Sequence, residues 1–181
     1  MIALPVGDRI FEVGAGHPER VLFDCLMPTP YGTTYNAYLI EGEEKTVLID
    51  TVDPEKTEVL IQNLKEADVS HLDYLIILHT EQDHSGSIAA IVNRYPAVQV
   101  IGNEKIRELL AAHLHYDPNQ VLVVKEGDSL NLGGRTIRFL MTPFAHWPDN
   151  MMAFLEEERI LFSNDLFGSH YATPKTFATS S

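Results

Sequence analysis

Apolar positions follow two different periods along the chain. Residues 35–41 and 45–51 are largely apolar on either side of Gly42-Glu43-Glu44, which predicts two strands joined as a hairpin. Beyond them, apolar residues recur at helical spacing over 60–67. That helix is expected to begin at Asp53-Pro54-Glu55, where a side-chain acceptor, a proline and an acid follow one another.

Strands and helices then alternate. Residues 75–78 are all apolar, which is typical of a strand buried on both faces. The pattern next predicts a helix over 87–95, a strand over 98–101 and a helix capped by Asn103. A further buried strand is expected over 121–124.

Strands dominate after residue 121. Gly133-Gly134 predicts a hairpin with a primed turn, and Glu156-Glu157-Glu158 separates two more strands, 151–155 and 159–163. The fold class expected is therefore α/β, with a mixed sheet or two sheets and helices packed outside. The tail after Leu166 is short and polar.

Length and charge indicate the number of domains and exclude some kinds of partner. With 181 residues, the chain is expected to form one domain over 1–181. The net charge of −13 argues against nucleic acid and anionic membranes as partners. The sequence contains neither an apolar run long enough to span a membrane nor a signal-like N-terminus, so we expect a cytoplasmic protein. Cys25 is the single cysteine, which excludes an intrachain disulfide.

The segment most informative about chemistry is His79-Thr80-Glu81-Gln82-Asp83-His84. It holds four side chains able to bind metal and directly follows the buried strand 75–78. Ligand sites in open α/β sheets lie at the carboxyl ends of strands. A solvated polar loop is the simpler interpretation, but this density of ligands after a buried strand favours a metal site.

Two further candidates also follow strands. His146 comes after the strand that ends near Met141, and Asp165 comes after the strand that ends near Ser163. Taken singly, His146 would be an ordinary loop histidine and Asp165 an ordinary turn residue. Three strand ends that converge on one edge instead predict a binuclear metal centre.

These residues resemble a known family. The motif His79-x-Glu81-x-Asp83-His84, with His146 and Asp165 at these separations, resembles the metallo-β-lactamase fold. Hydrolases of that superfamily usually carry histidine where Glu81 stands, whereas the glutamate form is similar to the flavodiiron proteins. The resemblance implies an αββα sandwich of mixed sheets with helices outside, here apparently truncated at its C-terminal end.

The resemblance also implies a ligand assignment. His79, Glu81 and His146 would hold one iron, Asp83 and His84 would hold a second, and Asp165 would bridge the two. The family's second iron takes another histidine from further along the chain, and no histidine follows His170 here. The flavodoxin-like domain that carries FMN in the family is absent from the sequence as well.

Three more residues are candidates for supporting roles. Asp50 ends a buried strand and is expected to orient a metal-binding imidazole. Trp147 adjoins His146 and could be a packing residue or a pocket wall that faces the flavin. His170 is expected to contact the metal ligands without binding metal itself. The alternative is that His170 replaces the family's missing histidine ligand.

The resemblance implies an oxidoreductase that reduces O2 to water or NO to nitrous oxide. Its electrons would come from FMN on a separate domain or protein, through a flavin or rubredoxin-type donor, and the family's pairing implies a homodimer. Three alternatives remain open: a diiron oxygen sensor, a dizinc hydrolase and a metal-free interaction module. Glu81 in place of histidine counts against the hydrolase.

Overall fold

The computed structural model describes residues 3–172, so the part of the polar tail beyond residue 172 lies outside it. A seven-stranded mixed sheet forms the centre, with the strand order β1-β2-β7-β8-β9-β10-β11. Neighbours from β1 to β8 are antiparallel, and those from β8 to β11 are parallel. The bounds are β1 (Leu4–Gly7), β2 (Ile10–Glu12), β7 (Tyr38–Glu41), β8 (Thr46–Ile49), β9 (Tyr74–Ile76), β10 (Gln99–Gly102) and β11 (Val121–Val123).

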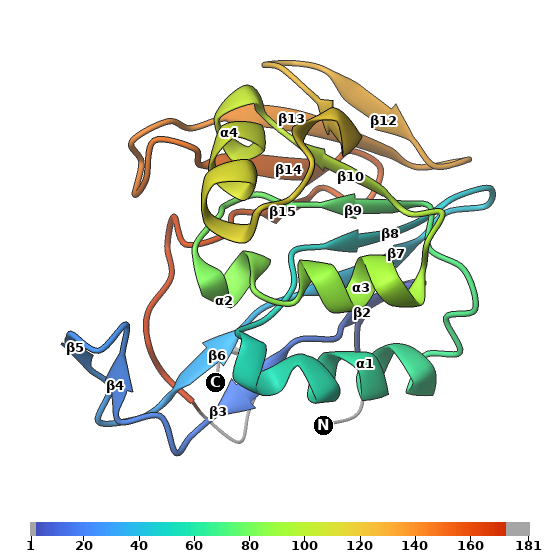
Figure 1. The fold of residues 1–181 in the computed structure, drawn as a ribbon. Coiled ribbons are helices and arrows are strands. Elements are labelled where there is room, and N and C mark those ends of the chain that lie inside the picture. Colours follow the sequence, from blue (N-terminus) through green and yellow to red (C-terminus); the bar gives the residue numbers. More distant parts are fainter. Residues whose placement is uncertain (1–2, 173–181) are drawn as a thin grey trace.

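A second, antiparallel sheet packs on the first. It contains β12 (Ser129–Asn131), β13 (Thr136–Met141), β14 (Met151–Leu155) and β15 (Ile160–Phe162). The rings of Tyr38 in the first sheet and Phe162 in the second lie 5.0 Å apart. Figure 1 shows α1 and α3 along one side of the central sheet and the second sheet on its other side. Helices thus lie outside a pair of sheets, as expected.

Two helical segments begin at the caps that the sequence predicts, η1 before α1 at Asp53 and α4 at Asn103. The Asp53 side chain accepts a hydrogen bond from Glu55 N, and Asn103 accepts one from Ile106 N, both at 2.9 Å. These caps satisfy amide groups that a helix N-terminus otherwise leaves unpaired. The helical segments are η1 (Pro54–Lys56), α1 (Thr57–Glu66), α2 (Gln82–Ser85), α3 (Ile88–Arg94), α4 (Glu104–Leu114) and η2 (Pro118–Gln120).

The expected primed turn is confirmed. Gly133 and Gly134 have φ angles of 78° and 72°, and Leu132 N donates to Arg135 O across the turn. Both angles lie in the left-handed region, which glycine enters without a Cβ clash. The turn therefore fixes the register of β12 against β13.

The strands differ from the prediction in one place and add to it in another. The segment 121–124 is not buried on both faces, because β11 lies at the sheet edge and Leu122 is 46% exposed. The N-terminal region, for which no elements are expected, forms short strands. In addition to β1 and β2, these are β3 (Ala15–His17), β4 (Leu22–Phe23), β5 (Met27–Pro28) and β6 (Thr33–Tyr35). Runs of two to four residues are too short to show a period of two.

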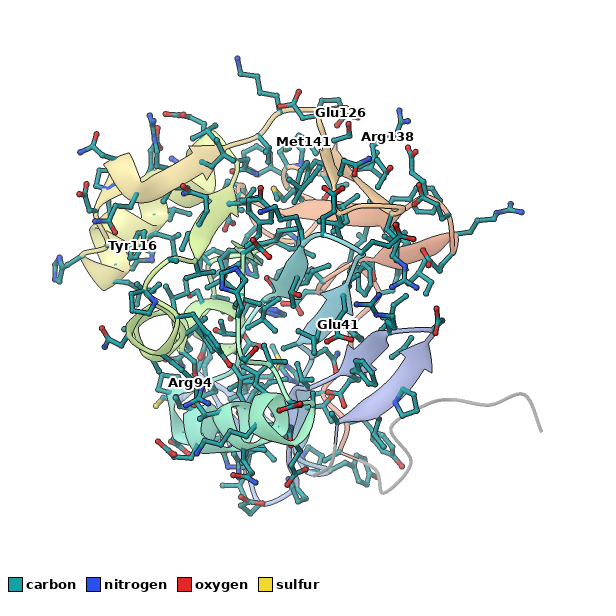
Figure 2. The ribbon with its side chains drawn as sticks, turned by 90° about the vertical axis from the view of Figure 1, so that its right-hand side faces the viewer. Glu41, Arg94, Tyr116, Glu126, Arg138 and Met141 are labelled. Carbon is teal, nitrogen blue, oxygen red and sulfur yellow. The ribbon has the colours of Figure 1, made fainter. Side chains whose placement is uncertain are left out.

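The buried strand β9 leads directly into the candidate metal motif. Leu75, Ile76, Ile77 and Leu78 are at most 1% exposed, and His79 follows them. In Figure 1 this end of the sheet lies beside α2. Figure 2 is turned by 90° from Figure 1, so that the right-hand side of Figure 1 faces the viewer; it labels Glu41, the last residue of β7, and Glu126 and Arg138 at the margin of the second sheet. Within residues 3–172, no helix is long and apolar enough to cross a membrane.

Candidate metal centre

The motif that follows β9 folds into a single helical turn. The carbonyl oxygen of Glu81 accepts hydrogen bonds from the amides of His84 and Ser85, and the Ser85 hydroxyl donates to Thr80 O. The sequence predicts a loop here, because a four-residue helix has no visible periodicity. The turn, α2, places Asp83 and His84 on the same end of the sheet as His79 and Glu81.

One group of four side chains surrounds a common point. It consists of His79, Glu81, His146 and Asp165, whose ligand atoms all lie within 4.8 Å of one another. Glu81 Oε2 lies 3.1 Å from His79 Nε2 and 3.3 Å from His146 Nε2. Three strand ends thus contribute to one site, as the sequence predicts.

A second group shares a member with the first. Asp83, His84 and Asp165 also bring one ligand atom each within 4.8 Å of the others. Asp165 Oδ1 lies 2.9 Å from His84 Nε2, while its Oδ2 lies 3.4 Å from His146 Nε2. The two oxygens of one carboxylate therefore face different groups, which is the arrangement that a bridging ligand needs.

One carboxylate oxygen of Asp83 has no hydrogen-bond partner within residues 3–172, although the other lies 3.4 Å from His84 Nε2. The unpartnered atom, Oδ1, is buried. Burial raises the pKa of Asp83 to about 6, and the nearby charges of Asp165 and Glu81 act in the same direction, although His84 opposes them. A buried carboxylate oxygen without a partner is costly unless a cation binds it.

Protons compensate the acidic groups when metal is absent. Burial lowers the pKa of His79, but hydrogen bonds to Asp149 and Glu81 outweigh it and raise the pKa to about 9. Burial also acts against protonation of His84, yet the Asp83 charge and hydrogen bonds to Asp165 and Asp50 hold its pKa well above the ordinary value. The site therefore favours positive charge, which protons or metal ions can supply.

Glu81 is strongly acidic in these surroundings. Burial raises the pKa of its carboxyl, but hydrogen bonds with His79, Asp24 and His146 together lower it to about 2. Asp24 lies at the tip of the hairpin of β4 and β5, where its Oδ1 accepts a hydrogen bond from Gln82 Nε2 at 2.9 Å. The hairpin thus reaches the edge of the first group.

Each buried histidine is oriented by its own aspartate. His79 Nδ1 lies 3.1 Å from Asp149 Oδ1, and His84 Nδ1 lies 3.2 Å from Asp50 Oδ2. A carboxylate accepts, so Nδ1 of each ring carries a proton, and Nε2 is the atom that would bind metal once a metal ion displaces its own proton. Asp50 was expected in this position, whereas Asp149 was missed. Asp149 is fully buried, and its only sequence signal is an acid two residues before an apolar strand.

The remaining candidates lie in different places. The Trp147 ring is 5.2 Å from the His79 ring and 36% exposed, so it borders the centre. Its role as a wall toward a flavin stays a prediction. His170 belongs to neither ligand group, and its Nδ1 instead lies 3.0 Å from the Thr33 hydroxyl. The structure therefore does not bring His170 to the cluster.

Comparison with known proteins gives consistent matches. A family model described as ODP family beta lactamase matches residues 33–181. Flavo-diiron protein FprA2 of Clostridium acetobutylicum is 41% identical over 181 residues, which cover 99% of this chain and 45% of that protein. The anaerobic nitric oxide reductase flavorubredoxin of Aliivibrio fischeri is 44% identical over 95% of this chain and 34% of its own length.

Solved structures of similar fold come from the same group of proteins as these sequence relatives. Rubredoxin oxygen:oxidoreductase of Desulfovibrio gigas has a TM-score of 0.89 and 37% identity, and the match covers 96% of this chain and 43% of that one. The flavodiiron protein of Giardia intestinalis has a TM-score of 0.89 and 28% identity over 97% of this chain and 42% of its own. The chain thus spans less than half the length of these relatives.

Proposed function

The chain belongs to the ODP family of β-lactamase-like domains, which includes the flavodiiron proteins, and we propose that it is the diiron domain of a reductase. Both the resemblance seen in the motif and the metallo-β-lactamase-like sandwich are thereby confirmed. The proposed reactions are the reduction of O2 to water and of NO to nitrous oxide. They are supported by the names of two relatives, an oxygen oxidoreductase and a nitric oxide reductase.

The observation that carries this proposal is the pair of ligand groups that share Asp165. His79, Glu81 and His146 would hold one iron, Asp83 and His84 the other, and Asp165 both. The donors are three imidazoles and three carboxylates without a thiolate, a set that suits iron better than a structural zinc site. The unpartnered oxygen of Asp83 marks a point where a cation would be stabilised.

Two ferrous ions held there would supply electrons to the gas. The protein residues supply geometry and charge. Asp149 and Asp50 hold the two buried imidazoles with Nε2 directed at the cluster. Glu81, Asp83 and Asp165 would offset the charge of the cations and would favour the ferric state formed on turnover. No side chain needs to act as a nucleophile.

We propose that the electrons come from FMN on a separate domain or protein, with a rubredoxin-type donor before it. The relatives' names, flavorubredoxin and flavo-diiron protein, support this route. Trp147 is the candidate for the side chain that faces the flavin, since it borders the cluster and remains partly exposed. A homodimer in the cytoplasm is the setting that we propose.

The experiment is steady-state consumption of NO and of O2 by the iron-loaded chain with a supplied reduced flavin donor. We expect at least one gas to be consumed faster than by the flavin donor alone. This additional consumption should be lost in Glu81→Ala. Glu58→Ala, on the exposed face of α1, is the matched control and should behave as wild type. Iron bound without turnover of either gas would instead favour the oxygen sensor. Stoichiometric zinc that iron supplementation does not displace would favour the hydrolase.

A further inference from the structure

His170 connects the segment after Asp165 to the N-terminal part of the chain. Its Nδ1 lies 3.0 Å from the Thr33 hydroxyl, and its ring lies 4.5 Å from the ring of Phe23. Thr33 begins β6 and Phe23 ends β4, so both partners are more than a hundred residues away in sequence. A second link follows, where Ala172 N donates to Tyr31 O at 2.9 Å.

His170 packs on the buried residue of the hairpin of β4 and β5. Among residues 22–27, Phe23 is the buried side chain, at 5% exposure, whereas Leu26 is 84% exposed. Phe23 directly precedes Asp24, which contacts Gln82 and Glu81 at the edge of the first ligand group. Packing of His170 on Phe23 therefore fixes the residue that reaches the metal cluster.

The same contact also constrains the bridging carboxylate. Directly after Asp165 the chain makes a tight turn, in which the amides of Phe167 and Gly168 both donate to Asp165 O at 2.9 Å. A Cβ at Gly168 would lie only 3.2 Å from that oxygen, so the turn closes tightly on Asp165. This short, hydrogen-bonded connection joins Asp165 to His170.

We propose that His170, Thr33 and Phe23 form a clasp that positions Asp24 and Asp165 around the metal centre and slows the release of metal. The inference rests on the proposed metal site and adds a positioning residue to it. His170 acts through the hairpin and the turn rather than by binding metal. With the clasp intact, the N-terminal hairpin positions Asp24 and the segment after β15 positions Asp165.

The test measures metal release rather than turnover. The chain is loaded with zinc, mixed with an excess of a colorimetric zinc chelator, and followed by absorbance. Thr33→Val removes the hydroxyl that contacts His170, and Thr33→Ser keeps it. His170→Phe keeps a ring on Phe23 but removes the nitrogen. Thr34→Val makes the same change as Thr33→Val at the neighbouring position of β6 and serves as the control.

We expect Thr33→Val and His170→Phe each to release zinc faster by about fivefold, the effect of one lost hydrogen bond. The double variant should be no faster than either single variant, because both remove the same contact. Thr33→Ser and Thr34→Val should match wild type. Melting temperatures, measured in parallel, separate this effect from a loss of stability.

Wild-type release rates in both Thr33→Val and His170→Phe would overturn the clasp, even if their melting temperatures fell. Equal acceleration in Thr34→Val would overturn it as well. A wild-type chain that binds no zinc or iron would refute the metal site and the clasp together. Altered release in a chain that binds iron but reduces neither gas would support the clasp and refute the reductase.

Discussion

Asp149 holds His79 in place with both of its carboxylate oxygens. They lie 3.1 and 3.2 Å from Nδ1 of the imidazole, and solvent reaches neither side chain. Oδ2 also accepts hydrogen bonds from the amide and the hydroxyl of Thr80. The carboxylate therefore fixes the ring and the first turn of the metal motif together.

Removing the charge of Asp149 should weaken one metal position selectively. Asp149→Asn is expected to lower affinity at the His79 position by about 10-fold to 100-fold, the usual cost of losing such a support. Asp50→Asn should do the same at the His84 position. Titration of the metal-free variants with ferrous iron measures both steps, and an equal loss at both positions in both variants would refute the pairing.

Exchange of Glu81 should change metal preference. Glu81→His replaces an anionic oxygen ligand with a neutral imidazole, so the variant should keep metal but shift from iron toward zinc. Elemental analysis after growth with both metals measures the ratio. Gln62→His adds an imidazole on the exposed face of α1, outside both ligand groups, and its ratio should stay at the wild-type value. A shift in the control as large as that in Glu81→His would contradict the assignment.

The metal-free protein should lose stability as the pH rises. The pKa of His79 is about 9 in the folded chain, against an ordinary value of 6.5 in an unfolded chain. The folded protein therefore binds this proton more tightly than the unfolded protein does. The resulting stabilisation is complete below pH 6.5 and is lost as the pH approaches 9. Urea denaturation across that range should show a falling free energy of unfolding. A flat profile in the metal-free wild type would contradict the protonated cluster.

A buried acid outside the metal centre makes a separate prediction. Burial raises the pKa of Glu12 to about 7, against a hydrogen bond from Gly14 N that lowers it. Because the pKa of Glu12 is higher in the folded chain than in the unfolded chain, the free energy of unfolding falls as the pH rises from 4.5 to 7. Glu12→Gln keeps an acceptor for Gly14 and carries no charge, so it should be more stable than wild type at pH 8 by about 1 to 3 kcal/mol.

The control for Glu12→Gln is Glu58→Gln on α1, which is exposed and should leave the free energy of unfolding unchanged. Denaturation at pH 4.5 should show no difference between Glu12→Gln and wild type. A variant that is less stable than wild type at pH 8 would mean that the ionised carboxylate makes a favourable contact.

The sequence predicts those parts of the site that depend on strand ends. His79, His146 and Asp165 follow three strands, and the sheet geometry brings such ends together. Asp149 could not be paired with His79 in this way, because the contact joins residues 70 apart and depends on packing. The prediction that His170 lies beside the metal ligands was wrong for the same reason. Its separation of five residues from Asp165 does not reveal the turn that directs it toward Thr33. Most elements after residue 35 were predictable, whereas the short N-terminal strands β1 to β6 and the one-turn helix α2 were not.

The most direct test of the account is the number of metal ions that each chain holds. Elemental analysis and anomalous scattering on protein grown with ample iron should give two iron positions per chain. The Asp83 and His84 position should be the less filled, because it has fewer ligands of its own. Asp165→Ala should lose binuclear binding, because both groups share that carboxylate. Two ions retained in Asp165→Ala, or a wild-type chain without iron, would contradict the binuclear centre.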